Sequence, residues 1–174
     1  EWKEIRLDID KSVNPDVIGT MTNMSEIETG SVDAIYSSHN IEHLYPHEVG
    51  TALMEFHRVL AEDGFVMLTC PDLQSVCQLV AEDKLLEPAY TSPAGPIAPI
   101  DMLYGFRPSM AAGNLYMSHR SGFTRKTLIG IFKHFGFKSV AGSRREANFD
   151  LFCLASKKEL AEDELITLAK AHFP

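Results

Sequence analysis

The sequence predicts an α/β fold in which strands alternate with helices around one sheet. Short apolar runs suited to strands recur between stretches with a helical period. One of them, "FVMLTC" (65–70), is nearly all apolar, as expected of a central parallel strand buried on both faces. Strands that alternate with helices imply parallel strands joined by crossover connections. The whole chain, 1–174, is therefore expected to form a single domain.

Three further apolar runs precede this strand and are predicted to be strands as well. They are "EIRLDID" (4–10), "PDVIGTM" (15–21) and "GSVDAIYSS" (30–38). The first and third alternate apolar and polar residues, which is the period of a strand with one buried face. The first also ends in acidic residues, so we expect carboxylates at the end of that strand.

A helix is predicted between the third and fourth strands. It should begin near Pro46, because proline suits the first helical turn. We expect Gly64 to end it as a left-handed C-cap. Its apolar residues fall on one face, as in a helix that packs on a sheet. They are Val49, Ala52, Leu53, Phe56, Val59 and Leu60.

The region 87–123 lacks a clear helical or strand period and is expected to be an irregular insertion. Asp72 is predicted to cap a helix just before it. Four prolines in "EPAYTSPAGPIAP" (87–99) predict a stiff loop, and "IDMLYGF" (100–106) reads as one or two helical turns. Loops of this kind often form lids and binding pockets.

The C-terminal part is predicted to contain a helix, two strands and a closing helix. Thr124 should cap the first helix, and Gly136 should stop it. "FKSVAGS" (137–143) and "NFDLFCLAS" (148–156) are predicted to be strands. The segment 159–173 is expected to be an amphipathic helix.

Composition excludes several classes of partner. The 174 residues are 45% hydrophobic with a formal charge of −8, and no Lys/Arg run is longer than a pair. A nucleic-acid partner is not expected, because such binders need a concentrated cationic face. No apolar stretch approaches the roughly 20 residues that cross a bilayer. Three cysteines without zinc-site spacing indicate reduced thiols, and we expect a cytoplasmic location.

Three histidines, His39, His43 and His47, are spaced four residues apart. On a continuous helix they would form one metal-binding face, but Pro46 interrupts that helix and the order is not His-Glu-x-x-His. We therefore expect no metal site. His43 and Glu42 are instead expected to hydrogen-bond locally and to fix the turn between strand and helix. His39 is expected in a pocket at the strand end, where it could act as a general base.

The order of these segments resembles the class I S-adenosylmethionine-dependent methyltransferases. The segments are an acid-ended strand, "VDAIYSSHNIEHL", a helix, "RVLAEDGFVML", "GFTRKTL" and "FGF". More narrowly, the chain is similar to small predicted methyltransferases with SHxxEHL and RVLxxGG-like segments. The similarity covers roughly 4–157. It implies a Rossmann-like sheet with strand order 3-2-1-4-5-7-6, mostly parallel with an antiparallel C-terminal strand.

The resemblance also implies S-adenosylmethionine as the cofactor, bound at the carboxyl ends of the strands. Asp8 matches the acid that binds the ribose hydroxyls, a task for which a carboxylate is suited because it accepts two hydroxyl donors. Asp10 is the alternative if the register differs by two residues. Ser38 and His39 match the positions beside the methionine moiety and the transferred methyl group.

Three further residues correspond to the adenine side of the cofactor site. Thr20 and Met21 match the adenine-binding acid of the family and its neighbour, and Asn23 matches a common second acid. Thr20 and Asn23 depart from the acids of the family pattern.

The family's first strand and its GxGxG turn have no counterpart, because the chain contains no Gly-x-Gly. The sequence therefore predicts either an N-terminal truncation of a longer protein with impaired cofactor binding, or a form that has lost cofactor binding. In the family order, the first strand lies between the strands at 4–10 and 30–38. We expect this gap to be closed, either by direct pairing of the two strands or by a second copy in a homodimer.

The acceptor side is expected at "YMSHRSGF" (116–123), which carries Tyr116, His119 and Arg120. Arg120 could clamp a carboxylate or phosphate of the acceptor, or pair with a surface acid. Two functions follow from the sequence. One is methyl transfer to a small-molecule or glycan-like acceptor, which mainly needs in-line positioning of nucleophile and methyl group. The other is a non-catalytic binding or dimerisation module.

Overall fold

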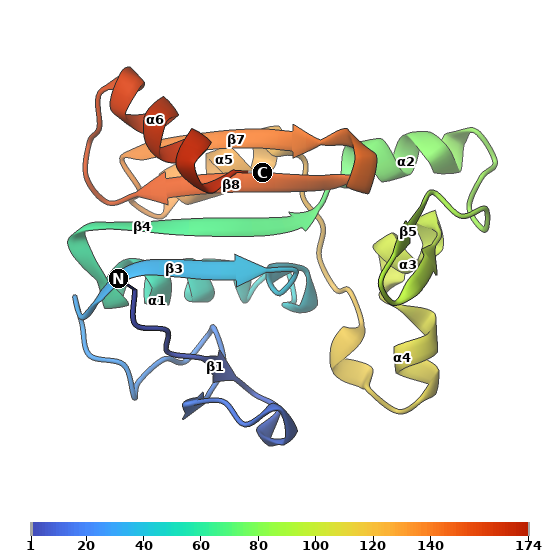
Figure 1. The fold of residues 1–174 in the computed structure, drawn as a ribbon, viewed down its shortest axis with the longest axis horizontal. Helices are drawn as coiled ribbons and strands as arrows, with labels where there is room; N and C mark the ends of the chain where they lie inside the picture. The colour runs from blue at the N-terminus through green and yellow to red at the C-terminus, as the bar shows by residue number, and fades with distance from the viewer. Residues whose placement is uncertain (1, 174) are drawn as a thin grey trace.

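A four-stranded sheet forms the centre of the computed structural model, which describes residues 2–173 (Figure 1). In spatial order, its strands are β3 (Val32–Ser38), β4 (Leu60–Pro71), β8 (Asp150–Ser156) and β7 (Ser139–Arg145). β3 and β4 are parallel, whereas β8 is antiparallel to both β4 and β7. Three of the four strands therefore run in one direction. The predicted Rossmann-like sheet with an antiparallel C-terminal strand is confirmed.

Helices cover both faces of this sheet (Figure 1). α1 (Val49–Val59) and α5 (Arg125–His134) pack on one face, where residues of β4 and β8 such as Leu68 and Cys153 join the main core. α6 (Glu162–His172) packs on the opposite face against alternate residues of the same strands, such as Met67. Because side chains alternate across a strand, both faces of β4 and β8 are apolar and buried.

The apolar stripe of α1 is buried as predicted, but Gly64 does not end the helix. α1 stops at Val59, and Leu60 has extended backbone with φ −64° and ψ 136°. Leu60 is fully buried and pairs with Val32 of β3. The chain thus passes from helix to strand without a left-handed residue, and Gly64 lies inside β4.

The N-terminal strands are much shorter than predicted. Only β1 (Leu7–Asp8) and β2 (Val17–Ile18) form, and they pair in parallel with each other as a separate two-stranded sheet. Arg6 holds β1 beside β2, because its backbone N–H donates to the Asp16 carboxylate and its carbonyl accepts from the N–H groups of Asp16 and Val17.

Of the two ways in which the gap beside the 30–38 strand was expected to close, direct pairing with the 4–10 strand is wrong. Within residues 2–173, β3 is an edge strand that pairs only with β4. The edge strand leaves one row of backbone groups without sheet partners, which is a pairing surface for another strand.

The segment between α2 (Leu73–Ala81) and α5 contains more regular structure than predicted. Its elements are β5 (Tyr90–Ser92), β6 (Gly95–Ile97), α3 (Pro99–Tyr104), α4 (Arg107–Ala111) and a 3₁₀ turn, η3 (Leu115–Met117). The predicted stiff loop instead contains a hairpin over 90–97, in which Ser92 pairs with Gly95 across the turn and Gly95 takes φ +116°. The helical turns predicted over 100–106 are present in α3. The segment lies beyond the end of β4 (Figure 1).

The two predicted helix caps are present. Asp72 accepts a hydrogen bond from the N–H of Gln74 at 3.2 Å and begins α2. Thr124 accepts one from the N–H of Thr127 at 3.3 Å and begins α5. Each satisfies a backbone donor that the first helical turn leaves without a partner.

The packing of α1 on the sheet can be tested with two neighbouring residues. Leu53 is 0% exposed, whereas the adjacent Met54 is 54% exposed. We expect Leu53→Ala to lower the free energy of unfolding by about 2–5 kcal/mol, because it removes buried apolar atoms and leaves a cavity. Met54→Ala is the matched control and should change it by less than about 0.5 kcal/mol. Urea denaturation of both variants measures the difference; equal losses would contradict the packing described.

Candidate functional site

Polar residues gather where β3 and β4 end. Ser38 Oγ lies 2.9 Å from Thr69 Oγ1, and the backbone N–H of His39 donates to the Thr69 carbonyl at 3.0 Å. His39 then takes a left-handed conformation with φ +52°, which is uncommon for a residue with a side chain. This turn leads into a 3₁₀ turn, η2 (Ile41–His43). Ser38 and His39, both predicted to lie near the cofactor, are therefore placed at the carboxyl end of β3.

His39 lies between two buried carboxylates. Its Nδ1 is 3.3 Å from Glu42 Oε1, and its Nε2 is 3.6 Å from Asp150 Oδ2. Burial alone would lower the pKa of His39, but the contacts with Asp150 and Glu42 outweigh it and raise this pKa to about 9. A protonated imidazole has no lone pair to accept a proton. At neutral pH this arrangement favours an electrostatic role for His39 over a general-base role.

Asp150 begins β8 and is 2% exposed. Its carboxylate accepts two hydrogen bonds from Arg145, at 2.5 and 3.0 Å, in addition to the contact with His39. Burial raises the pKa of Asp150, but His39 and Arg145 more than compensate, and the pKa lies below its usual value. Asp150 is therefore an anion that holds His39 from the side of β8.

The Glu42 carboxylate has no hydrogen-bond donors comparable to those of Asp150. It is 1% exposed, and neither carboxylate oxygen has a hydrogen-bond partner, although His39 Nδ1 approaches Oε1. Its backbone carbonyl, in contrast, accepts from the N–H groups of Arg120 and Ser121 at 2.8 and 3.1 Å. The main chain at Glu42 is thus tied to a loop some 80 residues away.

His43 and His119 face each other beside Glu42. Their ring centroids are 5.0 Å apart. His43 Nδ1 is 3.1 Å from the Ser118 carbonyl, and His119 Nδ1 is 2.8 Å from the Met102 carbonyl. Because a carbonyl only accepts, both rings carry their proton on Nδ1 and leave Nε2 as an acceptor. Burial also lowers the pKa of His119, which favours the neutral ring.

One expectation about the histidines is corrected by these contacts. The prediction that the His43 side chain hydrogen-bonds locally is wrong, because its ring bonds to the carbonyl of Ser118. His47 is exposed and stacks on Tyr45 with ring centroids 5.7 Å apart. The group that the fold brings together is therefore Glu42, His43 and His119, in place of the three evenly spaced histidines.

A cavity of about 180 Å³ opens over this group. Its walls come from two parts of the chain, the ends of the sheet strands and the insertion 87–123. Besides His39, Glu42, His43 and His119, it is lined by the polar residues Asp101 and Asn148 and by apolar and aromatic side chains. These include Tyr90, Met102, Phe106 and Phe149.

The other predicted acceptor residues lie differently. Arg120 stacks its guanidinium over the ring of Tyr45 at 4.7 Å and donates to the His43 carbonyl at 3.2 Å. Tyr116 lies on η3 and is 57% exposed. Of the three residues, only His119 lines the cavity.

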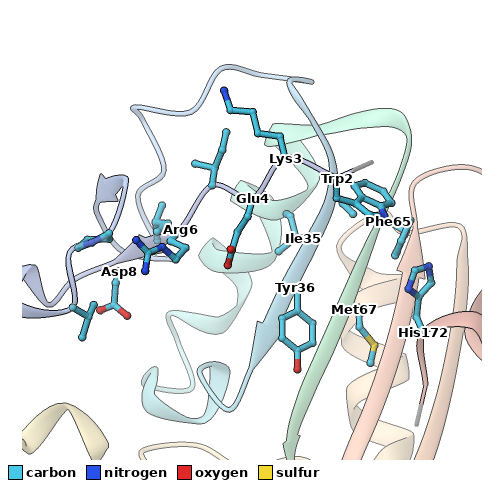
Figure 2. A pocket seen from close by; sticks show the side chains of 15 residues that line it. Trp2, Lys3, Glu4, Arg6, Asp8, Ile35, Tyr36, Phe65, Met67 and His172 are labelled. Atoms are coloured by element: carbon cyan, nitrogen blue, oxygen red, sulfur yellow. The ribbon is translucent and has the colours of Figure 1, made fainter.

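A second, larger groove of about 700 Å³ separates the N-terminal segment from the sheet. Figure 2 shows the segment with Lys3 and Arg6 on one side and Tyr36 of β3 on the other. Asp8 also lines this groove, and its carboxylate accepts from the N–H of Asp10 at 2.8 Å. Asp10 caps a 3₁₀ turn, η1 (Lys11–Val13), which occupies its carboxylate locally. Of these two acids, only Asp8 lines the groove, which Glu4 also lines.

The predicted adenine-side residues form a tight turn after β2. Thr20 and Asn23 pair across it, with the Asn23 N–H donating to the Thr20 carbonyl at 3.0 Å. Met21 packs against the main core, and its Sδ is 3.9 Å from Ser37 Oγ. The turn is therefore anchored beside β3.

Comparison with known proteins gives the class of fold. A model of the methyltransferase-domain family matches residues 5–68, and a search of curated protein sequences finds no match. The fold is similar to a protein from Pyrococcus horikoshii OT3 with TM-score 0.56 and 16% identity, covering 87% of this chain and 70% of that one.

Two enzymes show the same likeness. One is Burkholderia thailandensis 1,6-didemethyltoxoflavin-N1-methyltransferase, solved with S-adenosylhomocysteine, with TM-score 0.54, 15% identity, and 88% and 60% coverage of this chain and that one. The other is a possible histamine N-methyltransferase from Thermotoga maritima, with TM-score 0.51, 14% identity, and 80% and 62% coverage. The chain spans less than two thirds of either enzyme.

The family match and the fold agree. Residues 5–68 run from the N-terminal segment through β3 and α1 into β4, which includes the Ser38–His39 turn. The predicted resemblance to methyltransferases is confirmed for the fold and, in sequence, for residues 5–68. None of the helices between residues 2 and 173 has the length and apolar character to cross a bilayer.

Sequence reasoning missed Asp150 and the role of Glu42 as a buried acid. Asp150 lies inside "NFDLFCLAS", where an acid within an apolar run is the signal of a buried, partnered carboxylate. Glu42 follows a strand within a turn, and nothing local distinguishes it from an exposed acid.

Gly105 holds the loop that carries His119. It has φ +102°, and a Cβ at this position would overlap the carbonyl oxygen of Met117. Gly105 also pairs with Ser118, and the His119 N–H donates to the Tyr104 carbonyl at 3.1 Å. The absence of a side chain at Gly105 therefore permits the close approach that positions His119.

We expect Gly105→Ala to destabilise the protein and to displace this loop. Gly113→Ala is the matched control, because Gly113 has φ +98° but no atom within 4 Å of the place that an alanine methyl group would take. Both variants should suffer backbone strain of about 1–3 kcal/mol, and only Gly105→Ala adds the clash. The rate of hydrogen exchange at the His119 amide should increase more in Gly105→Ala than in Gly113→Ala. Equal exchange rates would contradict this role.

Proposed function

We propose that the chain forms the sheet and acceptor side of an S-adenosylmethionine-dependent methyltransferase acting on a small-molecule or glycan-like acceptor. The observation that carries the proposal is the Ser38–His39 turn, which lies at the carboxyl end of β3 and beside that of β4. Open α/β sheets bind ligands at this end of the strands. The family match over residues 5–68 includes this turn and supports the same assignment.

In this proposal, the cofactor contacts come from three turns. Asp8 binds the ribose hydroxyls, because its carboxylate lines the groove whereas that of Asp10 is used as a cap. Thr20, Met21 and Asn23 form the adenine side. Ser38 and His39 lie beside the methionine moiety, where a cationic His39 would attract the cofactor carboxylate.

The acceptor would enter the cavity of about 180 Å³. Its apolar and aromatic walls suit a small ligand held by a few polar groups. His119 lines the cavity and would contact the acceptor directly. Tyr116 and Arg120 would act at its rim, because Arg120 already stacks on Tyr45 and Tyr116 is exposed. The protein contributes by holding the nucleophile in line with the methyl group.

We expect this chain to bind the cofactor weakly, at a dissociation constant above the micromolar range. No Gly-x-Gly turn is available for close backbone contacts, and the groove beside β3 separates Asp8 from the sheet. Calorimetric titration with S-adenosylhomocysteine measures the affinity. Micromolar binding by the 174 residues would contradict the expectation.

If the reading frame extends upstream of Glu1, the longer product tests the function itself. If the protein is such an enzyme, that product should bind S-adenosylhomocysteine at micromolar concentration. Asp8→Ala should weaken this binding by about 1–3 kcal/mol, because it removes a hydrogen-bond acceptor. Asp63→Ala is the control, since Asp63 is an exposed acid near the start of β4, away from the carboxyl end of that strand. No binding by the longer product would overturn the proposed activity, and an unchanged Asp8→Ala affinity would exclude Asp8 as the ribose ligand.

The open edge of β3 favours a second candidate, a non-catalytic module that dimerises. Tyr36 on this strand is 71% exposed, and Ile5 and Trp2 across the groove are 52% and 67% exposed. An exposed edge with apolar residues is a surface on which a second copy could pair. Sedimentation velocity should then show a dimer that Tyr36→Lys weakens. A monomer at all concentrations would exclude the homodimer.

A further inference from the structure

Three potential metal ligands converge at the base of the smaller cavity. Glu42, His43 and His119 each place one ligand atom within 4.8 Å of the others. Glu42 and His43 come from η2, and His119 comes from the loop after η3. The two segments are fastened together by backbone hydrogen bonds from Arg120 and Ser121 to the Glu42 carbonyl. The convergence is thus fixed by the main chain.

Each histidine has one ring nitrogen engaged by a backbone carbonyl and the other left for a ligand. Their Nδ1 atoms are engaged by the carbonyls of Ser118 and Met102, at 3.1 and 2.8 Å. A metal-binding histidine typically donates its other ring N–H to a carbonyl or carboxylate, which fixes the tautomer and orients the ring. His43 and His119 therefore already have the outer contacts of ligands, and their Nε2 atoms carry the free lone pairs.

Glu42 supplies an independent observation. Its side chain is 1% exposed, and both carboxylate oxygens are buried without a hydrogen-bond partner. His39 approaches one oxygen at 3.3 Å, but it also faces Asp150 and leaves the other oxygen without a donor. Buried charges in proteins are normally paired and hydrogen-bonded, or they coordinate a metal. A cation between Glu42 and the two histidines would satisfy this carboxylate.

We propose that Glu42, His43 and His119 bind a divalent transition-metal ion such as Zn²⁺. One carboxylate oxygen and two imidazole nitrogens are a donor set that Zn²⁺ takes in sites that keep a position open. Mg²⁺ is disfavoured, because it prefers oxygen ligands in octahedral geometry. All three residues line the cavity, so the open positions of the ion face it. There the ion would hold water or an oxygen atom of a small ligand.

The site is tested with ZnCl₂ on the whole chain after removal of metal by a chelator. Calorimetry and equilibrium dialysis with elemental analysis should give one tightly bound ion per chain. Glu42→Gln and His119→Asn should each weaken binding by more than about 100-fold, because even the outer partners of metal ligands typically matter 10- to 100-fold. His47→Asn is the matched control, since His47 is a nearby exposed histidine, and it should bind as the parent chain does.

Two results would overturn the proposal. One is that the parent chain takes up no Zn²⁺ at micromolar concentration. The other is that Glu42→Gln and His119→Asn bind as tightly as the parent, which would assign the uptake to surface histidines.

A spectroscopic measurement on the parent chain covers the case in which a variant does not fold. In long-range ¹H–¹⁵N spectra of the histidine rings, Zn²⁺ should shift Nε2 of His43 and His119 while both keep the proton on Nδ1. The ring of His47 should not respond. Shifts confined to His47 or to other exposed histidines would exclude the site.

Discussion

The line of charges from Glu42 through His39 to Asp150 connects the parts of the structure that form the site. His39 follows β3, Glu42 lies in the next turn, and Asp150 begins β8, so one imidazole joins the strands on the two sides of β4. Both acids are buried, so solvent screens their contacts with His39 only weakly. The left-handed backbone of His39 is compatible with this arrangement, since it directs the chain from the strand into the turn.

Features of the fold that depend on neighbouring residues could be predicted from the sequence. The apolar run of β4, the stripe of α1, and the caps Asp72 and Thr124 all act over a few residues, and each is present. Predictions failed where a distant partner decided the outcome. Gly64 lies in a strand because Leu60 pairs with Val32, and the first strand is short because its backbone turns toward β2.

The candidate site likewise has parts that the sequence predicts and parts that depend on distant residues. The sequence placed Ser38 and His39 at the end of a strand and His119 in a pocket-forming segment, and the structure has them there. The partnership of His119 with His43 could not be predicted, because it spans 76 positions and depends on where the insertion folds back. The buried state of Glu42 depends on the same packing. A local hydrogen bond of the His43 side chain is therefore the wrong expectation for this turn.

The cavity walls come from two parts of the chain, which are the strand ends and the segment from β5 to η3. A ligand that contacts Glu42 on one wall and His119 or Met102 on the other gains its full set of contacts only when that segment is docked. By thermodynamic linkage, such a ligand favours the docked state by as much as docking favours the ligand. A residue that does not line the cavity but alters docking, such as Gly105 beside the His119 loop, would therefore change ligand affinity without touching the ligand.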